Sequence, residues 1–292
     1  TVTATATPSP SPTATPSPTM QPLRVAVHIE PQVVVQGHTV RIDLTTNRTG
    51  LVNLRCGEDV IPLATSDGRR HVAFVGVSPV AEPGKLGVEL WIDSPEGQRL
   101  TLDTTLVVVA GEYGFERLRF SEETSKLLAP EVTEPEREHL SQVYGFSDGT
   151  MLWEGTFDWP RDGIITSEFG TRRQYGDAFR SFHAGIDIDG EDGDVIVAPA
   201  RGIVRLAEKL DVRGNMVILD HGLGVMSGYC HLSRIDVAPG DTVQRGQQIG
   251  LMGSTGLVTG PHLHWEMRVG GVPVSAREWT LRDMSAPPEE GM

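Results

Sequence analysis

Short segments that alternate between apolar and polar residues recur along the chain from residue 23 onward. Residues 39–45 and 86–92 place apolar side chains at every second position, as strands with one buried face do. Residues 100–109 add a further β-prone segment, and turn residues separate the three. The pattern predicts a small antiparallel β-sandwich of immunoglobulin-like type over residues 23–110.

The second half of the chain repeats the short strands with more glycine at the turns. Residues 202–207 form one expected strand, and residues 216–220 and 225–230 flank a Gly-rich turn that predicts a hairpin. From His262 to Val269 polar and apolar side chains alternate, so His262 and His264 should project from one face, roughly 6.6 Å apart at Cα. We therefore predict an almost wholly β domain over residues 153–282.

Residues 111–152 lack a sustained alternation and are predicted to be a connector. Thr133-Glu-Pro-Glu136 has the form of a capping box with proline in the first turn. An apolar stripe of Leu140, Val143 and Tyr144 follows it. We expect a short helix over residues 134–144 that packs against one of the two domains.

The two ends of the chain are expected to lie outside the folded domains. Residues 1–19 contain only Thr, Val, Ala, Pro and Ser, a composition that cannot bury a core. We predict a disordered linker over residues 1–22 and a flexible tail over residues 283–292. Such tethers are typical of exported proteins, so we expect an extracellular or cell-envelope location, an N-terminal tether and no membrane span in this chain.

The charge balance narrows the range of partners. With 25 basic and 39 acidic residues the net charge is −14, which argues against nucleic acid as a ligand. The two cysteines, Cys56 and Cys230, fall in different predicted domains, so we expect no disulfide between them. In a strand Cys230 should face away from His231, and we expect a buried thiol rather than a metal ligand.

Five of the nine histidines lie between residues 182 and 266, and their spacing indicates metal chemistry. His183 and Asp187, followed some 75 residues later by the pair His262 and His264, offer N and O donors that suit Zn²⁺, and three protein ligands would leave a fourth position for water. In a straight strand His183 and Asp187 would be about 13 Å apart, so we expect a bend at Gly185. His221, at a turn, is expected only to hydrogen-bond its own hairpin.

Three motifs are His183-x₃-Asp187, Tyr229-Cys-His231-Leu-Ser233 and Gly260-Pro-His262-Leu-His264. They resemble, in this order, the signatures of the LytM/lysostaphin-type zinc endopeptidases of peptidase family M23. That resemblance implies a duplicated hybrid motif fold. The resemblance covers about residues 153–280. It implies one Zn²⁺ per chain held by His183, Asp187 and His264, with His231 and His262 as catalytic residues. It also implies a peptide substrate from the stems or cross-bridges of bacterial peptidoglycan.

Several alternatives stay open at this stage. A non-catalytic relative could bind the cell wall or activate a separate amidase, and a zinc peptidase could have another specificity. The sequence does not divide proton transfer and oxyanion stabilisation between His231 and His262. We also expect Glu266 to support His264 as a hydrogen-bond acceptor. Substrate contacts are expected from a loop that contains Arg172, Arg173 and Tyr175.

Overall fold

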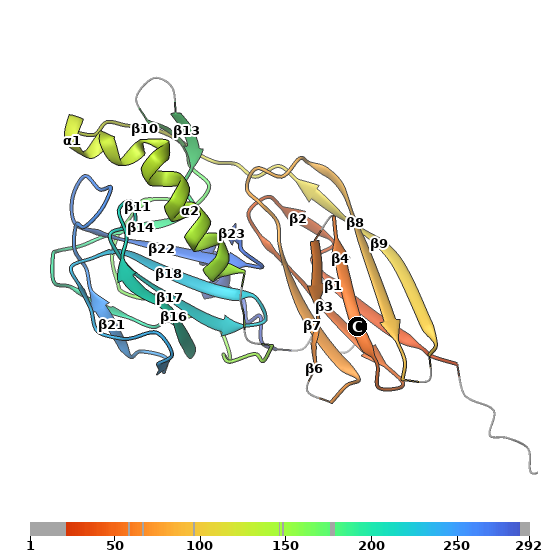
Figure 1. The fold of residues 1–292 in the computed structure, drawn as a ribbon. Coiled ribbons are helices and arrows are strands. Elements are labelled where there is room, and N and C mark those ends of the chain that lie inside the picture. The colour runs from red at the N-terminus through yellow and green to blue at the C-terminus, as the bar shows by residue number, and fades with distance from the viewer. Residues whose placement is uncertain are drawn as a thin grey trace, which may run out of the picture.

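The computed structural model describes residues 22–57, 59–65, 67–95, 97–145, 147, 149–175 and 179–286. The predicted linker, apart from residue 22, and the last six residues of the predicted tail lie outside these described residues. Figure 1 shows two β-rich units, the N-terminal one in red to yellow and the C-terminal one in green to blue. The prediction of a mainly β protein with a short helical connector is confirmed. Among the described helices, none is long and apolar enough to cross a membrane.

Two sheets enclose one apolar core in the N-terminal unit. One sheet has the order β1–β3–β7–β6, and the other has the order β2–β9–β8–β4–β5. Their strands are β1 (Val25–Glu30), β2 (Val33–Val35), β3 (Thr39–Thr46), β4 (Leu51–Cys56), β5 (Asp59–Pro62), β6 (Ala64–Thr65), β7 (Arg70–Gly76), β8 (Gly84–Asp93) and β9 (Arg99–Val109). Ile42 and Leu90, one from each sheet, are fully buried in this core. The three predicted strands appear as β3, β8 and β9, and the immunoglobulin-like likeness stays a prediction.

The C-terminal unit is built around a sheet with the order β11–β14–β22–β18–β17–β16–β20, with β23 paired to β22. Its strands are β11 (Ile165–Ser167), β14 (Gly185–Asp189), β16 (Gly202–Lys209), β17 (Asn215–Gly222), β18 (Val225–Leu232), β20 (Thr242–Val243), β22 (His262–Val269) and β23 (Val272–Val274). One smaller sheet contains β10 (Phe115–Leu118), β12 (Arg172–Tyr175) and β13 (Phe179–Phe182). The other contains β15 (Val195–Val197), β21 (Gln248–Leu251) and β19 (Arg234–Ile235). The predicted hairpin is confirmed as β17 and β18.

The large sheet has two faces with different chemistry. On the face that we call the core face, Leu263 and Trp265 of β22 join the main apolar cluster of the unit. On the opposite face, the site face, the same strand presents His264 and Glu266, both buried. This confirms the predicted alternation along β22, since successive strand residues point to opposite sides.

The connector packs on the site face of this sheet. Helix α2 (Pro130–Tyr144) lies across the strands in Figure 1 and buries Leu140 and Tyr144 against apolar residues of β16, β17 and β18. It begins at Pro130 rather than at residue 134, so the predicted capping box at Thr133 is wrong. Proline suits the first helical position because no backbone N–H is needed there. Helices α1 (Glu122–Ser125) and η1 (Lys126–Leu128) precede α2.

The two units share an apolar contact. Phe74 of β7 packs against Trp153 and Trp279, with ring centroids 5.6 and 5.8 Å apart. Trp279 lies in helix α3 (Ala276–Leu281). Arg41 of β3 donates a 2.5 Å hydrogen bond to the carbonyl oxygen of Met284. The N-terminal unit therefore buttresses the C-terminal one on the side where its core is aromatic.

Candidate active site

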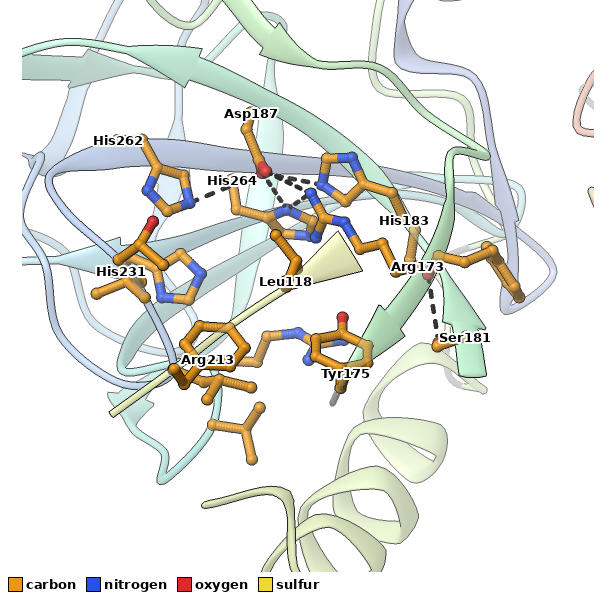
Figure 2. Close-up of a pocket in the computed structure, with 17 residues that line it drawn as sticks. Leu118, Arg173, Tyr175, Ser181, His183, Asp187, Arg213, His231, His262 and His264 are labelled. Atoms are coloured by element: carbon orange, nitrogen blue, oxygen red, sulfur yellow. Dashed lines mark hydrogen bonds and ion pairs between the residues drawn. The ribbon is translucent and has the colours of Figure 1, made fainter. Parts of the chain in front are cut away.

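His183, Asp187 and His264 converge on one point of the site face (Figure 2). Asp187 in β14 lies directly opposite His264 in β22, and His183 precedes β14. The Oδ1 atom of Asp187 lies 2.9 Å from Nε2 of His183 and 2.8 Å from Nδ1 of His264. The two nitrogens are 2.9 Å apart. Three atoms, two from paired strands and one from the residue just before β14, thus form a triangle with sides of about 3 Å.

Gly185 does not form the predicted bend, and it helps to shape the site in another way. It lies inside β14, paired with Glu266, and its φ is not in the left-handed region. A Cβ atom at this position would meet the carbonyl oxygen of Trp265 at 2.4 Å. The glycine is needed because the backbones of β14 and β22 approach closely here, which sets Asp187 against His264. The change of chain direction lies before Gly185, where β13 ends and His183 precedes β14.

Hydrogen bonds fix the tautomers of both ring systems. His183 Nδ1 lies 3.0 Å from the carbonyl oxygen of Glu168, so it must donate, and Nε2 carries the lone pair. His264 Nε2 lies 3.0 Å from a carboxylate oxygen of Glu266, so it donates and Nδ1 carries the lone pair. Burial lowers the pKa of His183 to about 4, so this ring is neutral near pH 7. Two lone pairs and a carboxylate oxygen therefore face one another.

Such a convergence of acceptors favours a positive charge at its centre. Burial lowers the pKa of His264, but the hydrogen bonds that a protonated ring would donate to both Asp187 and Glu266 outweigh that effect and raise the pKa above the ordinary value. Two imidazole nitrogens and one carboxylate oxygen are also the ligand types of catalytic zinc sites that keep a fourth position for water. The residues present therefore fit one Zn²⁺.

Two further imidazoles face the same space. The rings of His231 and His262 lie 5.0 Å apart, and the His231 ring lies 6.0 Å from that of His264. His262 Nδ1 donates to the carbonyl oxygen of Gly260 at 2.9 Å, and its Nε2 lies 3.8 Å from Oδ1 of Asp187. His231 Nδ1 donates to the carbonyl oxygen of Thr255 at 2.8 Å. Among the described residues neither Nε2 atom has a hydrogen-bonding partner, so both can act as acceptors.

The comparisons with known proteins agree with this geometry. The family model for peptidase family M23 matches residues 181–276. Residues 181–276 are an M23 peptidase domain. A crystal structure of a peptidase M23 from Pseudomonas aeruginosa superposes with a TM-score of 0.62, at 26% identity over 84% of this chain and 94% of that one.

Two curated relatives carry named activities. The chain is 40% identical over 157 residues to the peptidoglycan DD-endopeptidase ShyA of Vibrio cholerae serotype O1, over 53% of this chain and 36% of the relative. It is 40% identical over 111 residues to the DD-carboxypeptidase/endopeptidase Mpg of Neisseria meningitidis serogroup B, over 38% of this chain and 26% of the relative. The chain thus spans about a third or less of the length of these two proteins.

His231 of the M23 domain reaches the site through an unusual backbone conformation. Its φ is +65°, which is uncommon for a residue other than glycine. Regular alternation would send its side chain to the core face, opposite to Cys230, but the left-handed turn brings the ring to the site face. Cys230 lies opposite His264, with its sulfur within 4.8 Å of ligand atoms of His264 and Glu266.

The expected opposition of Cys230 and His231 is therefore wrong, whereas the expected buried thiol is found. Burial raises the pKa of Cys230 well above its ordinary value, which disfavours the thiolate that metal binding requires. Burial and the neighbouring rings of His262 and His264 lower the pKa of His231 well below its ordinary value.

A second layer of charges holds the three converging residues of the M23 domain. Arg173 donates to Oδ2 of Asp187 at 2.7 Å and to Ser167 Oγ at 2.9 Å. Arg173 lies in strand β12, so the expected loop at residues 172–175 is a strand that pairs with β10 and β13. Burial raises the pKa of Asp187, but the adjoining histidines outweigh this and hold it well below the ordinary value.

Glu266 holds the other side, as expected from the sequence. It accepts from His264, and also from Arg268 at 2.9 Å and from Arg213 at 3.3 Å. Burial raises the pKa of Glu266, but the positive charges of Arg268 and Arg213 outweigh this effect and hold the pKa well below the ordinary value. The carboxylate therefore stays ionised and fixes the His264 ring.

The five histidine and aspartate side chains line a cavity of about 160 Å³. Arg213, Tyr175 and the connector residue Leu118 also line it (Figure 2). A second connector residue, Phe120, completes this wall. Sequence reasoning missed Leu118 and Phe120, because they reach the site through the parallel pairing of β10 with β12. Arg172 instead donates to the carbonyl oxygen of Pro79 and lies outside the set of residues that line this cavity.

Proposed function

We propose that this chain is a zinc-dependent endopeptidase that hydrolyses peptide bonds in the stems or cross-bridges of bacterial peptidoglycan. The observation that carries the proposal is the meeting of three fixed acceptor atoms, from His183, Asp187 and His264, beside two imidazoles with free Nε2 atoms. A non-catalytic binding module would have no use for the two free imidazoles. The named activities of the relatives support the substrate class.

The site residues divide into ligands and proton carriers. We assign His183, Asp187 and His264 to one Zn²⁺, whose chemistry is to polarise a carbonyl group and to lower the pKa of water. His262 is assigned to proton uptake, because its Nε2 lies 3.8 Å from a ligand oxygen of Asp187. His231 is assigned to the oxyanion or the leaving amine, because its Nε2 is free on the adjacent wall of the cavity.

Digestion of purified peptidoglycans with different cross-bridges tests the proposal. We expect soluble products whose masses identify one scissile peptide bond, loss of activity with a chelator and recovery with Zn²⁺. Binding to peptidoglycan without any cleavage in the presence of Zn²⁺, or activation of an added amidase alone, would contradict the proposal and favour the non-catalytic alternative.

A further inference from the structure

We propose that Glu136 of the connector helix is a positioning residue for His231, so that the connector completes the active site. The inference rests on the proposed function. Helix α2 lies outside the matched M23 domain, yet Figure 1 shows it across the site face of the large sheet. Its contact with the loop between β16 and β17 links it to the catalytic histidine.

The first step is the capture of that loop by a buried carboxylate. Glu136 is 9% exposed, which is rare for a glutamate without a compensating partner. Its Oε2 accepts from the backbone N–H of Val212 at 2.7 Å, and its Oε1 accepts from the N–H of Arg213 at 3.1 Å. Both oxygens therefore bind consecutive amides, and the loop is fixed in position and direction against α2.

The second step runs from the same loop to His231. The carbonyl oxygen of Arg213 accepts from the backbone N–H of His231 at 2.9 Å. The same residue, Arg213, therefore links Glu136 to the backbone of His231, whose φ is +65°. A left-handed conformation costs a non-glycine residue energy and persists only where its surroundings fix it.

The third step closes the arrangement around the His231 ring. Thr255, whose carbonyl oxygen accepts from Nδ1 of His231, also accepts through Oγ1 from the N–H of Asn215 at 2.9 Å. A Cβ atom at Gly214 would lie 2.3 Å from the carbonyl oxygen of Thr255, so the two loops are in close contact. Backbone and ring of His231 are thus both held by the segment that Glu136 anchors.

The test compares Glu136→Gln with two controls. Gln keeps the size of Glu but offers an N–H₂ group to one of the two amides, so one hydrogen bond is lost. Glu138→Gln changes an exposed residue of the same helix. Leu140→Ala loosens the packing of α2 on the sheet and leaves the carboxylate in place. Each zinc-loaded protein is assayed for kcat and KM on a cross-linked peptidoglycan fragment, for bound zinc and for thermal unfolding.

Imidazole ¹⁵N spectra add a readout that does not need activity, with the His231 signals assigned by their loss in His231→Ala. For Glu136→Gln we expect kcat to fall about 10- to 100-fold, with KM within about twofold, zinc unchanged and His231 signals shifted. Glu138→Gln should match the wild type. Leu140→Ala should lower the unfolding temperature, with a smaller loss of kcat and His231 signals near those of the wild type.

Wild-type kcat and unshifted His231 signals in Glu136→Gln would overturn the inference. So would a loss in Leu140→Ala as large as in Glu136→Gln, since general loosening of the helix would then explain both. If Glu136→Gln fails to fold, Glu136→Asp, which keeps the charge but shortens the reach, is subject to the same criteria. If the wild-type protein cleaves no peptidoglycan, the proposed function fails, and the His231 spectra alone decide the role of Glu136.

Discussion

His221 and His264 lie in the same sheet and are both buried, but on opposite faces. On the core face, His221 donates from Nδ1 to the carbonyl oxygen of Arg201 and accepts at Nε2 from the Ser227 hydroxyl, both at 2.8 Å. On the site face, His264 donates from Nε2 to Glu266 and turns its lone pair toward Asp187 and His183.

The difference shows what separates a structural histidine from a metal ligand. Burial is nearly the same, and each ring has an acceptor for its N–H. At the other nitrogen, His221 meets a donor hydroxyl, whereas His264 meets two acceptors that need a cation. Accordingly, burial lowers the pKa of His221 to about 4, while the carboxylates around His264 raise its pKa. His221 hydrogen-bonds its own hairpin through Ser227, as expected, and it also bonds Arg201 outside the hairpin.

The largest contrast is expected between His264→Ala and His221→Ala. His264→Ala removes one zinc ligand, so bound zinc should be lost and hydrolysis should fall by more than about 10⁴-fold. His221→Ala should retain zinc and lower the free energy of unfolding by about 2–4 kcal/mol, because a packed and hydrogen-bonded ring is removed. Metal analysis and denaturant unfolding of both variants measure this. A zinc-loaded His264→Ala protein would reverse the assignment.

His231→Ala and His262→Ala should separate proton transfer from metal binding within the site. Neither ring belongs to the converging triangle, so zinc content should stay at one ion per chain. Turnover should fall about 10²- to 10⁴-fold, the range for loss of a general acid or base. Zinc content and peptidoglycan digestion are measured side by side; full turnover in either variant counts against that residue's role.

Acid should destabilise the protein through His221. Its folded pKa of about 4 lies below the unfolded value near 6.5, so between these values the unfolded state binds more protons. Stability is therefore lost as the pH falls from 6.5 to 4, by about 3 kcal/mol from this residue. The difference in unfolding free energy between wild type and His221→Gln should shrink by that amount; a pH-independent difference would show that His221 is not buried as described.

Glu266→Gln should weaken zinc binding without abolishing it. The amide oxygen can still accept from His264, but the charge that balances Arg213 and Arg268 is gone. Loss of such an outer partner typically costs 10- to 100-fold in metal affinity or activity. Chelator competition measures the zinc affinity, with the exposed Glu208→Gln as control; equal affinities in the two variants would mean that Glu266 does not support His264.

Much of this site follows from local sequence. Alternation along β22 places His264 and Glu266 on one face and Leu263 on the other, and the structure has this arrangement. His183 and Asp187 were also expected to lie close together, through a bend at Gly185, and their side chains meet at 2.9 Å without that bend. The local sequence could not show how this contact is made, because the close approach of the two strands at Gly185 depends on the backbone of Trp265, about 80 residues away in the chain.

The parts that sequence reasoning missed depend on long-range contacts. The left-handed conformation of His231 breaks the strand period that the prediction assumed, and it is held by residues near 213 and 255. Arg173 reaches Asp187 because β12 pairs with β10 and β13. Glu136 was assigned to a local cap, but its carboxylate binds amides about 75 residues further along the chain. No local periodicity encodes these contacts.

Anomalous scattering at the zinc absorption edge from a crystal of the zinc-loaded protein tests the central claim most directly. We predict one peak per chain, about 2.0–2.2 Å from His183 Nε2, Asp187 Oδ1 and His264 Nδ1. A peak coordinated by the Cys230 sulfur with His264 and Glu266, or no peak among these residues, would contradict the account.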